Sequence, residues 1–203
     1  MKKKNNYVTL SGEICSDFKY VTTNRNVKFY MVYLKVYRFS GKYDIIPLMV
    51  SERLIDTQYS MTGLYAKVTG SFRSHNEPNG VKSKVLLYVY ANWLEIIEPI
   101  KNDDNINIIE LDAHIPRIPE YRRTPMGRDI TDTILAVNRL DKRTDYLPAI
   151  FWGRDAKYVK NLNIGDNIKI IGRIQSREYE KKISDTEVEV RTAYEVSVKE
   201  ILK

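Results

Sequence analysis

The chain has 203 residues, of which 43% are hydrophobic and 29% are charged, and its net charge is +7. No apolar run approaches the roughly 18–20 residues that cross a membrane, and the first ten residues, MKKKNNYVTL, lack the apolar core of an export signal, so we expect a cytoplasmic protein. One cysteine and two histidines exclude an internal disulfide and argue against a structural zinc site, and we expect no metal or cofactor. The basic excess favours a polyanionic partner.

Each half of the chain contains five segments in which apolar and polar residues alternate, a pattern typical of strands. They span residues 7–15, 27–39, 43–51, 64–74 and 83–98 in the first half, and 106–115, 128–139, 145–153, 166–177 and 188–199 in the second. Between the third and fourth strands, residues 51–59 and 154–161 each predict a helix of two turns. Five strands with a helix between the third and fourth are the element order of the OB fold, a small Greek-key barrel.

The two halves are copies of one unit. Residues 10–53 align without a gap with residues 111–154, with 10 identities in 44 positions, where average composition gives about 3. A period of about 100 residues fits one small domain. The sequence therefore predicts an all-β protein of two tandem OB barrels, residues 1–98 and 106–203, joined by a polar linker at residues 99–105.

Catalytic signatures are missing from the sequence. There is no G-x-S-x-G, no phosphate-binding P-loop and no H-E-x-x-H, and His75 and His114 do not fall at matching positions of the repeat. We expect a binding protein rather than an enzyme.

The third strand of the second copy carries aromatic side chains on the face that a barrel does not need for its core. Alternation places Leu147 and Phe151 on one face, and Tyr146 and Trp152 on the other. Rings six residues apart lie about 20 Å apart along a strand and can stack on separate bases of a single strand. The alternative is that these rings pack against another subunit.

Four segments of the second copy occur in the order and spacing of a known family. They read TPMG at 124–127, LAVNR at 135–139, FWGR at 151–154 and GRIQSREY at 172–179. This half therefore resembles the bacterial single-stranded DNA-binding protein, in a tandem two-barrel form. The resemblance implies an OB fold that binds single-stranded DNA with little sequence preference during replication, recombination and repair.

The resemblance also assigns roles to residues. It implies base stacking on Tyr146, Trp152 and Tyr179, and phosphate contacts from Arg122, Arg154, Arg173 and Arg177. We add to the expected site the neighbouring basic side chains Arg123, Arg139, Lys142, Arg143, Lys181 and Lys182.

Two departures from the family affect these expectations. The family's aromatic in the loop after LAVNR has no counterpart, because Leu140, Asp141 and Lys142 occupy that region. We therefore expect a somewhat weaker or shorter stacking surface. The family's acidic carboxy-terminal tail is also absent before Lys203, so tail-mediated recruitment of replication partners is not expected. Because members commonly assemble four barrels, two barrels per chain predict a homodimer.

The first copy departs further from the family. Ile45 stands where the second copy has Tyr146, Ser51 stands in place of Trp152, and Glu77 falls near the position of Tyr179. The apolar alternation of this strand is retained, so the barrel is expected to survive while its stacking face is stripped.

The first copy nevertheless carries most of the net charge, with 14 basic and 8 acidic side chains in residues 1–100. One interpretation is that Arg38, Arg53 and Arg73 contact DNA phosphates. The other, slightly favoured, is that its tyrosine-rich face is a subunit interface. For the whole chain, the alternative to DNA binding is an OB-fold adaptor that joins proteins of a replication or primosome assembly.

Overall fold

The computed structural model describes the chain except for residues 1–4, 57, 78–83, 100, 102–104, 183–187 and 203. Within the described residues it contains twelve strands and one helix. The first half forms β1 (Asn6–Ile14), β2 (Lys19–Asn24), β3 (Val27–Tyr37), β4 (Tyr43–Ser51), β5 (Tyr65–Glu77) and β6 (Lys84–Ile97). The second half forms β7 (Asn107–His114), β8 (Glu120–Arg123), β9 (Asp129–Asn138), β10 (Thr144–Trp152), α1 (Gly153–Val159), β11 (Asn167–Lys182) and β12 (Val188–Leu202).

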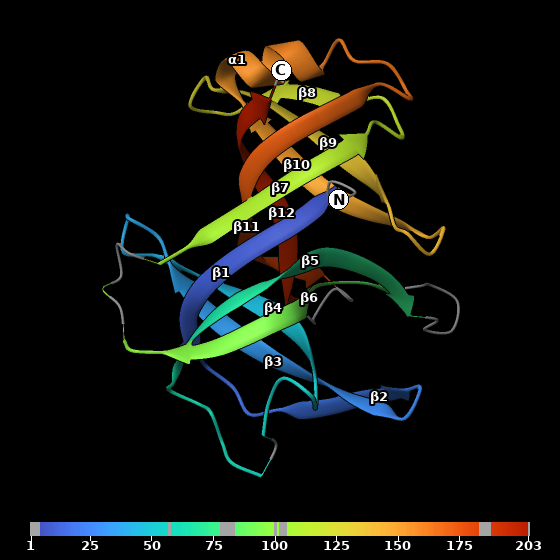
Figure 1. Cartoon of the computed structure of the whole chain (residues 1–203). Coiled ribbons are helices and arrows are strands. Elements are labelled where there is room, and N and C mark those ends of the chain that lie inside the picture. The colour runs from blue at the N-terminus through green and yellow to red at the C-terminus, as the bar shows by residue number, and fades with distance from the viewer. Residues whose placement is uncertain are drawn as a thin grey trace.

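The strands close into two OB barrels, one above the other in Figure 1, which confirms the predicted fold. The first barrel runs β1-β3-β4-β6-β5 and back to β1, and the second runs β7-β9-β10-β12-β11 and back to β7. The pairs β4–β6 and β10–β12 are parallel and all other pairs are antiparallel. The short strands β2 and β8, which were not predicted, each add a hairpin to the edge of β3 or β9.

Alternating side chains fill each barrel from one face of every strand. In β3, Val32, Leu34 and Val36 are almost completely buried, whereas Tyr33 between them is 39% exposed. In β10, Leu147 is completely buried beside the exposed Tyr146. Because successive side chains of a strand point to opposite faces, the inward set makes the core and the outward set remains available for contacts.

The helix predicted after the third strand forms only in the second copy. There α1 buries Ala156 and Val159 against the barrel. The helix predicted at residues 51–59 is wrong for the described part of this segment, which forms turns. Glu52 is held by β3, since its side chain accepts a hydrogen bond from the Lys28 amide at 2.9 Å. Asp56 accepts one from the Gln58 amide at 3.0 Å, a local turn that competes with helix formation.

The barrels are joined edge to edge by antiparallel pairing of β1 with β7, the blue and yellow-green strands that cross the middle of Figure 1. Val8 faces Ile109, its own counterpart in the repeat, at the centre of this pairing. The two barrels are therefore related by an approximate twofold axis, as in a symmetric dimer made from one chain. Of the predicted linker at 99–105, residues 100 and 102–104 lie outside the described part of the chain.

Two asparagine side chains extend the pairing of β1 with β5 and of β7 with β11 beyond the end of each main-chain ladder. The Asn6 side chain donates to the Phe72 carbonyl at 2.7 Å and accepts from the Phe72 amide at 2.9 Å. Asn107 makes the same pair of hydrogen bonds with Ile174, at 2.8 and 2.9 Å. Each side-chain amide thus replaces a peptide group where the main-chain ladder has ended. The main-chain amide and carbonyl of Phe72 and of Ile174 therefore keep hydrogen-bond partners.

Candidate nucleic-acid interface

One outward face of the second barrel is formed by the adjacent strands β9, β10, β12 and β11. Its three predicted stacking rings are all solvent-accessible: Tyr146 is 53% exposed, and Trp152 and Tyr179 are each 39% exposed. The Trp152 indole N–H donates to the Ser197 hydroxyl at 3.4 Å, which lays the ring across from β10 to β12. Tyr179 lies opposite Arg191, on the long extension of the β11–β12 hairpin. The three rings thus span this sheet and its projecting hairpin.

Basic side chains of the β8–β9 hairpin border this face. Arg122 pairs with Asp132 at 2.7 Å, and Arg123 pairs with Asp129 at 3.0 Å. Both guanidinium groups are more than half exposed, so these ion pairs are weak and a phosphate can compete for the arginines. Hydrogen bonds from Tyr121, Arg123 and Lys157 hold the pKa of the Asp129 carboxyl well below its usual range.

The remaining exposed cations of the predicted site surround the same barrel. Arg143 lies in the β9–β10 loop, with its side chain 69% exposed and paired with Asp141. The others described as exposed are Lys142, Arg154, Arg177, Lys181 and Lys182. In the first copy, Arg53 is exposed in the turn after β4. All of these side chains are accessible to solvent.

Four arginines of the predicted site are instead held between the barrels, around two completely buried carboxylates. Asp145 binds Arg139 of its own barrel and Arg73 of the other, the latter at 2.8 Å. Asp44 likewise binds Arg38 of its own barrel and Arg173 of the other at 3.5 Å. We call these two groups the interdomain charge clusters.

The clusters are reciprocal across the twofold axis. Asp145 accepts the Ser74 amide of the first barrel at 2.8 Å, and Asp44 accepts the Ser176 amide of the second at 2.7 Å. The Arg139 side chain also donates to the Ser74 carbonyl at 2.9 Å. Each buried carboxylate is thereby satisfied by both barrels, as a buried charge requires.

This arrangement changes the expected roles of Arg38, Arg73, Arg139 and Arg173. Their sequence positions predicted phosphate contacts, but each of them is bound to Asp44 or Asp145, and no more than 36% of any of these side chains is exposed. Withdrawing one of them would remove one of the two cations that compensate a buried carboxylate. They therefore fix the relative orientation of the two barrels.

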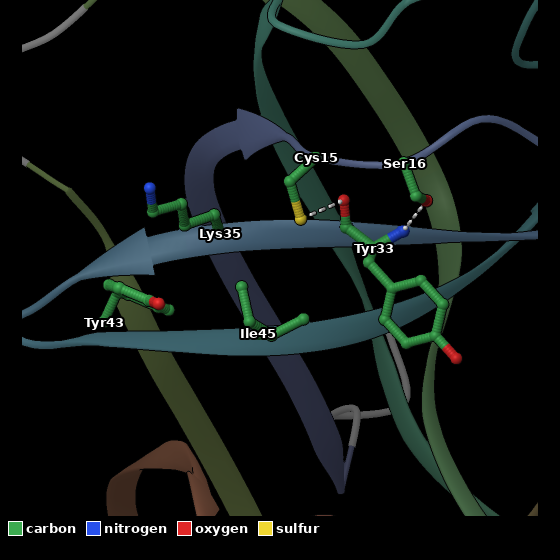
Figure 2. A pocket seen from close by; sticks show the side chains of 6 residues that line it. All are labelled: Cys15, Ser16, Tyr33, Lys35, Tyr43 and Ile45. Atoms are coloured by element: carbon green, nitrogen blue, oxygen red, sulfur yellow. Dashed lines mark hydrogen bonds between the residues drawn. The ribbon is translucent and has the colours of Figure 1, made fainter.

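In the first barrel, the equivalent outward face has a different composition. Ile45 and Ser51 occupy the places of Tyr146 and Trp152, as the repeat predicts. Beside Ile45 there is a shallow hollow, which Figure 2 shows lined by β3, β4 and the segment after β1. The Lys35 ammonium lies 4.7 Å from the centre of the Tyr43 ring and 4.9 Å from that of Tyr37.

The backbone of Tyr33 closes this hollow on its other side. Its amide donates to the Ser16 hydroxyl at 3.0 Å, and its carbonyl accepts from the Cys15 thiol at 3.4 Å, as Figure 2 shows. Burial is the main cause that raises the pKa of the Cys15 thiol. Cys15 is therefore a protonated packing residue at neutral pH.

A groove that sequence reasoning missed lies between the first barrel's outward face and the β9–β10 loop of the second barrel. Its floor carries Phe29, Met49, Tyr88 and Tyr90, and Arg143 is at its rim. In the sequence, the aromatic residues of this groove are noticeable only because the first half of the chain is rich in tyrosine. Their convergence depends on how the two barrels are joined, which no local pattern reveals.

The described residues also bear on membranes and metals. No helix among them is long and apolar enough to cross a membrane. Within the same part of the chain, no three His, Cys, Asp or Glu side chains gather as a metal site requires.

Comparison with known proteins identifies the second barrel. Residues 106–202 match the model of the single-strand binding protein family. The single-stranded DNA-binding protein of Clostridium tetani is 34% identical over 84 residues, which are 38% of this chain and 58% of that protein. Single-stranded DNA-binding protein A of Bacillus subtilis is 32% identical over 84 residues, 38% of this chain and 49% of that protein. The chain thus spans about half the length of the relatives it matches.

The whole chain is similar in fold to a solved structure. The wild-type single-stranded DNA binding protein from Thermus aquaticus aligns with 98% of this chain and 92% of its own, with a TM-score of 0.73 and 20% sequence identity. That similarity in fold includes the first half of the chain, which the family model does not reach. With its matching sequence segments, OB topology and exposed aromatic side chains, the part of this chain from residue 106 to 202 is similar to the single-strand binding protein family.

Proposed function

We propose that this protein binds single-stranded DNA without sequence preference and without catalysis, and that it protects exposed strands in replication, recombination and repair. The observation that carries the proposal is the open sheet face on which Tyr146, Trp152 and Tyr179 are exposed. Every base has a π-face, so stacking on such rings tolerates any sequence, and each stack is worth about 1–3 kcal/mol. Single-stranded DNA as the ligand implies a cytoplasmic site of action.

The electrostatic part of binding comes from the exposed cations around the sheet. Arg122 and Arg177 lie beside the stacking rings, and Lys181 and Lys182 extend the basic surface along the β11–β12 hairpin. Neutralising phosphates releases counterions, so affinity should fall steeply as salt rises. An adaptor that joins proteins without DNA would lack this salt dependence.

The test uses the fluorescence of Trp152. Replacing Trp93→Phe first removes the other tryptophan, which lies on β6, so that the signal comes from Trp152 alone. Titration with oligo(dT) should quench this fluorescence, and the quenching should weaken with added salt. In the same background, Trp152→Ala should lower affinity for a labelled oligo(dT), measured by anisotropy, by about 1–3 kcal/mol. Unchanged affinity would show that Trp152 does not stack on bases.

We further propose that two copies associate to give four barrels. The face of the joined sheet built on β1, β5, β6 and β7 carries the exposed Trp93 and Ile108, which are 42% and 44% accessible. Thr9 and Thr69 connect these two residues by direct register across the sheet, giving one uncharged row across four strands. Light scattering should report twice 23.8 kDa, and Ile108→Glu should shift the mass toward one chain.

A further inference from the structure

The groove between the barrels has the composition of a second stacking surface. Tyr90 lies beside Met49 in the parallel pairing of β6 with β4, and its ring centre is 5.8 Å from that of Phe29. Tyr88 lies two residues before Tyr90 on the same face of β6, opposite Arg73. Three partly exposed rings and a thioether thus form one apolar floor.

This floor stands in for the aromatic residues that the first barrel lacks on β4. In the second barrel, Ser197 of β12 lies beside Ile150 of β10, and the Trp152 ring reaches over to Ser197. In the first barrel, Tyr90 of β6 takes the position of Ser197, while Ser51 of β4 takes that of Trp152. The large and small residues have exchanged strands, so the ring is present on the same sheet face but comes from a different strand.

The charge around the groove favours a polyanion. Arg73, Arg139 and Arg143 line it together with a single acidic lining residue, Asp141, and the buried Asp145 completes the pairing of the first two arginines. Arg143 and Asp141 form an exposed pair at the rim, where screening makes their attraction small. A phosphate can therefore approach Arg143 while the bases contact the apolar floor.

The groove also continues the face of the second barrel. The Tyr146 amide donates to the Ser74 hydroxyl at 2.9 Å, and Ser74 follows Arg73 of the groove lining. Tyr146 is therefore located at the boundary between the two surfaces. A strand that stacks on Trp152 and Tyr146 meets the groove directly beyond Tyr146.

We propose that this groove is a second binding site for single-stranded DNA, in which Tyr88, Tyr90 and Phe29 stack on bases and Arg143 contacts phosphate. The inference rests on the proposed function of the second barrel and extends it across the interdomain boundary. The β9–β10 loop, which has no aromatic of its own, borders a site whose rings come from the first barrel.

The test compares two lengths of labelled oligo(dT). A short oligonucleotide of about 10 nucleotides fits one barrel, and one of about 30 spans both. The double substitution Tyr88→Ala/Tyr90→Ala should weaken binding of the long strand about tenfold or more, whereas the short strand should still quench Trp152 as in the parent Trp93→Phe protein. Retained quenching also shows that the variant is folded. Tyr59→Ala, at a site 68% exposed in the turn after β4, is the matched control.

A second measurement does not depend on variant stability. Photocrosslinking of 5-iodouracil-substituted strands to the unaltered protein should attach nucleotide to a peptide that contains Tyr88 or Tyr90, detected by mass spectrometry. Unchanged long-strand affinity in the double variant, together with no such crosslink, would overturn the second site. A change in the mass of the assembly without any effect on DNA would instead identify this face as a contact between copies. Failure of the parent protein to bind either strand would overturn the proposed function itself.

Discussion

The two barrels expose the same sheet face but build it from different residues. In the second barrel the large rings project from β10, where Tyr146 and Trp152 are exposed. In the first barrel β4 carries Ile45 and Ser51 at these places, and the rings come from Phe29 of β3 and Tyr90 of β6. A ring on this face can therefore come from either of two neighbouring strands without disturbing the barrel, because neighbouring strands are only about 5 Å apart.

The contacts that join the barrels are, in contrast, nearly the same in both copies. Arg38 with Asp44 and Arg139 with Asp145 occupy equivalent places, and each aspartate reaches a serine of the other barrel. Removing one partner of a buried ion pair is strongly destabilising, because it leaves the other charge without its partner. The repeat identities at these positions therefore coincide with the contacts between the barrels.

The largest expected effect comes from removing one of the two buried aspartates that join the barrels. Asp145→Ala leaves Arg139 and Arg73 without their carboxylate, and the free energy of unfolding should fall by about 3–5 kcal/mol, measured by urea denaturation. Asp44→Ala should cost less, because Arg173 lies 3.5 Å from Asp44 whereas Arg73 lies 2.8 Å from Asp145. Asp141→Ala, which removes an exposed pair, is the control and should cost less than about 1 kcal/mol. A cost for Asp145→Ala as small as the control's would contradict the structural role of the clusters.

A second prediction sharpens the contrast between the two faces. Tyr146→Ala removes a ring that is 53% exposed and should weaken oligo(dT) binding by about 1–3 kcal/mol. Ile45→Ala, at the equivalent place in the first barrel, should leave affinity nearly unchanged because it removes no ring. Anisotropy titrations of both variants at one salt concentration measure the difference. Equal losses would mean that the two faces contact DNA in the same way.

Salt dependence separates arginines that meet DNA from those that join the barrels. Arg177→Ala should reduce the slope of log affinity against log salt by about 0.7, the value for one phosphate contact on a single strand. Arg139→Ala should instead lower stability and leave the slope unchanged, because Arg139 is 13% exposed and bound to Asp145. Titrations across a range of salt concentrations test both variants. A reduced slope in Arg139→Ala would show that this arginine contacts phosphate.

The smallest effect concerns pH and the two hairpins. Asp129 has a lowered pKa because Tyr121, Arg123 and Lys157 donate hydrogen bonds to it, so its contribution to stability is present above about pH 4 and is lost as the pH falls through its lower folded-state pKa. The repeat places Lys28 at this position in the first barrel, which has no such contact. Urea unfolding of Asp129→Asn should therefore differ from the parent at neutral pH and converge with it in acid. A constant difference at every pH would assign the effect to packing.

Sequence by itself determined the repeat, the ten strands that close the two barrels, the OB topology and the outward direction of Tyr146, Trp152 and Tyr179. All of these follow from local alternation and from segments within one barrel, so nearby residues are sufficient to establish them. The sequence did not distinguish residues 51–59, which follow β4, from residues 154–161, which follow β10. A helix forms after β10 because Ala156 and Val159 pack against the second barrel.

Only the tertiary structure decided which arginines are held between the barrels. Arg38 and Arg139 appear in the sequence as basic residues like Arg122 or Arg177, yet Asp44 and Asp145 neutralise them within clusters that bring together residues more than 60 positions apart. The same holds for Tyr88 and Tyr90, whose groove is completed by a loop of the other barrel. Pairing of β1 with β7 creates both features, because it sets which surfaces of the two barrels meet.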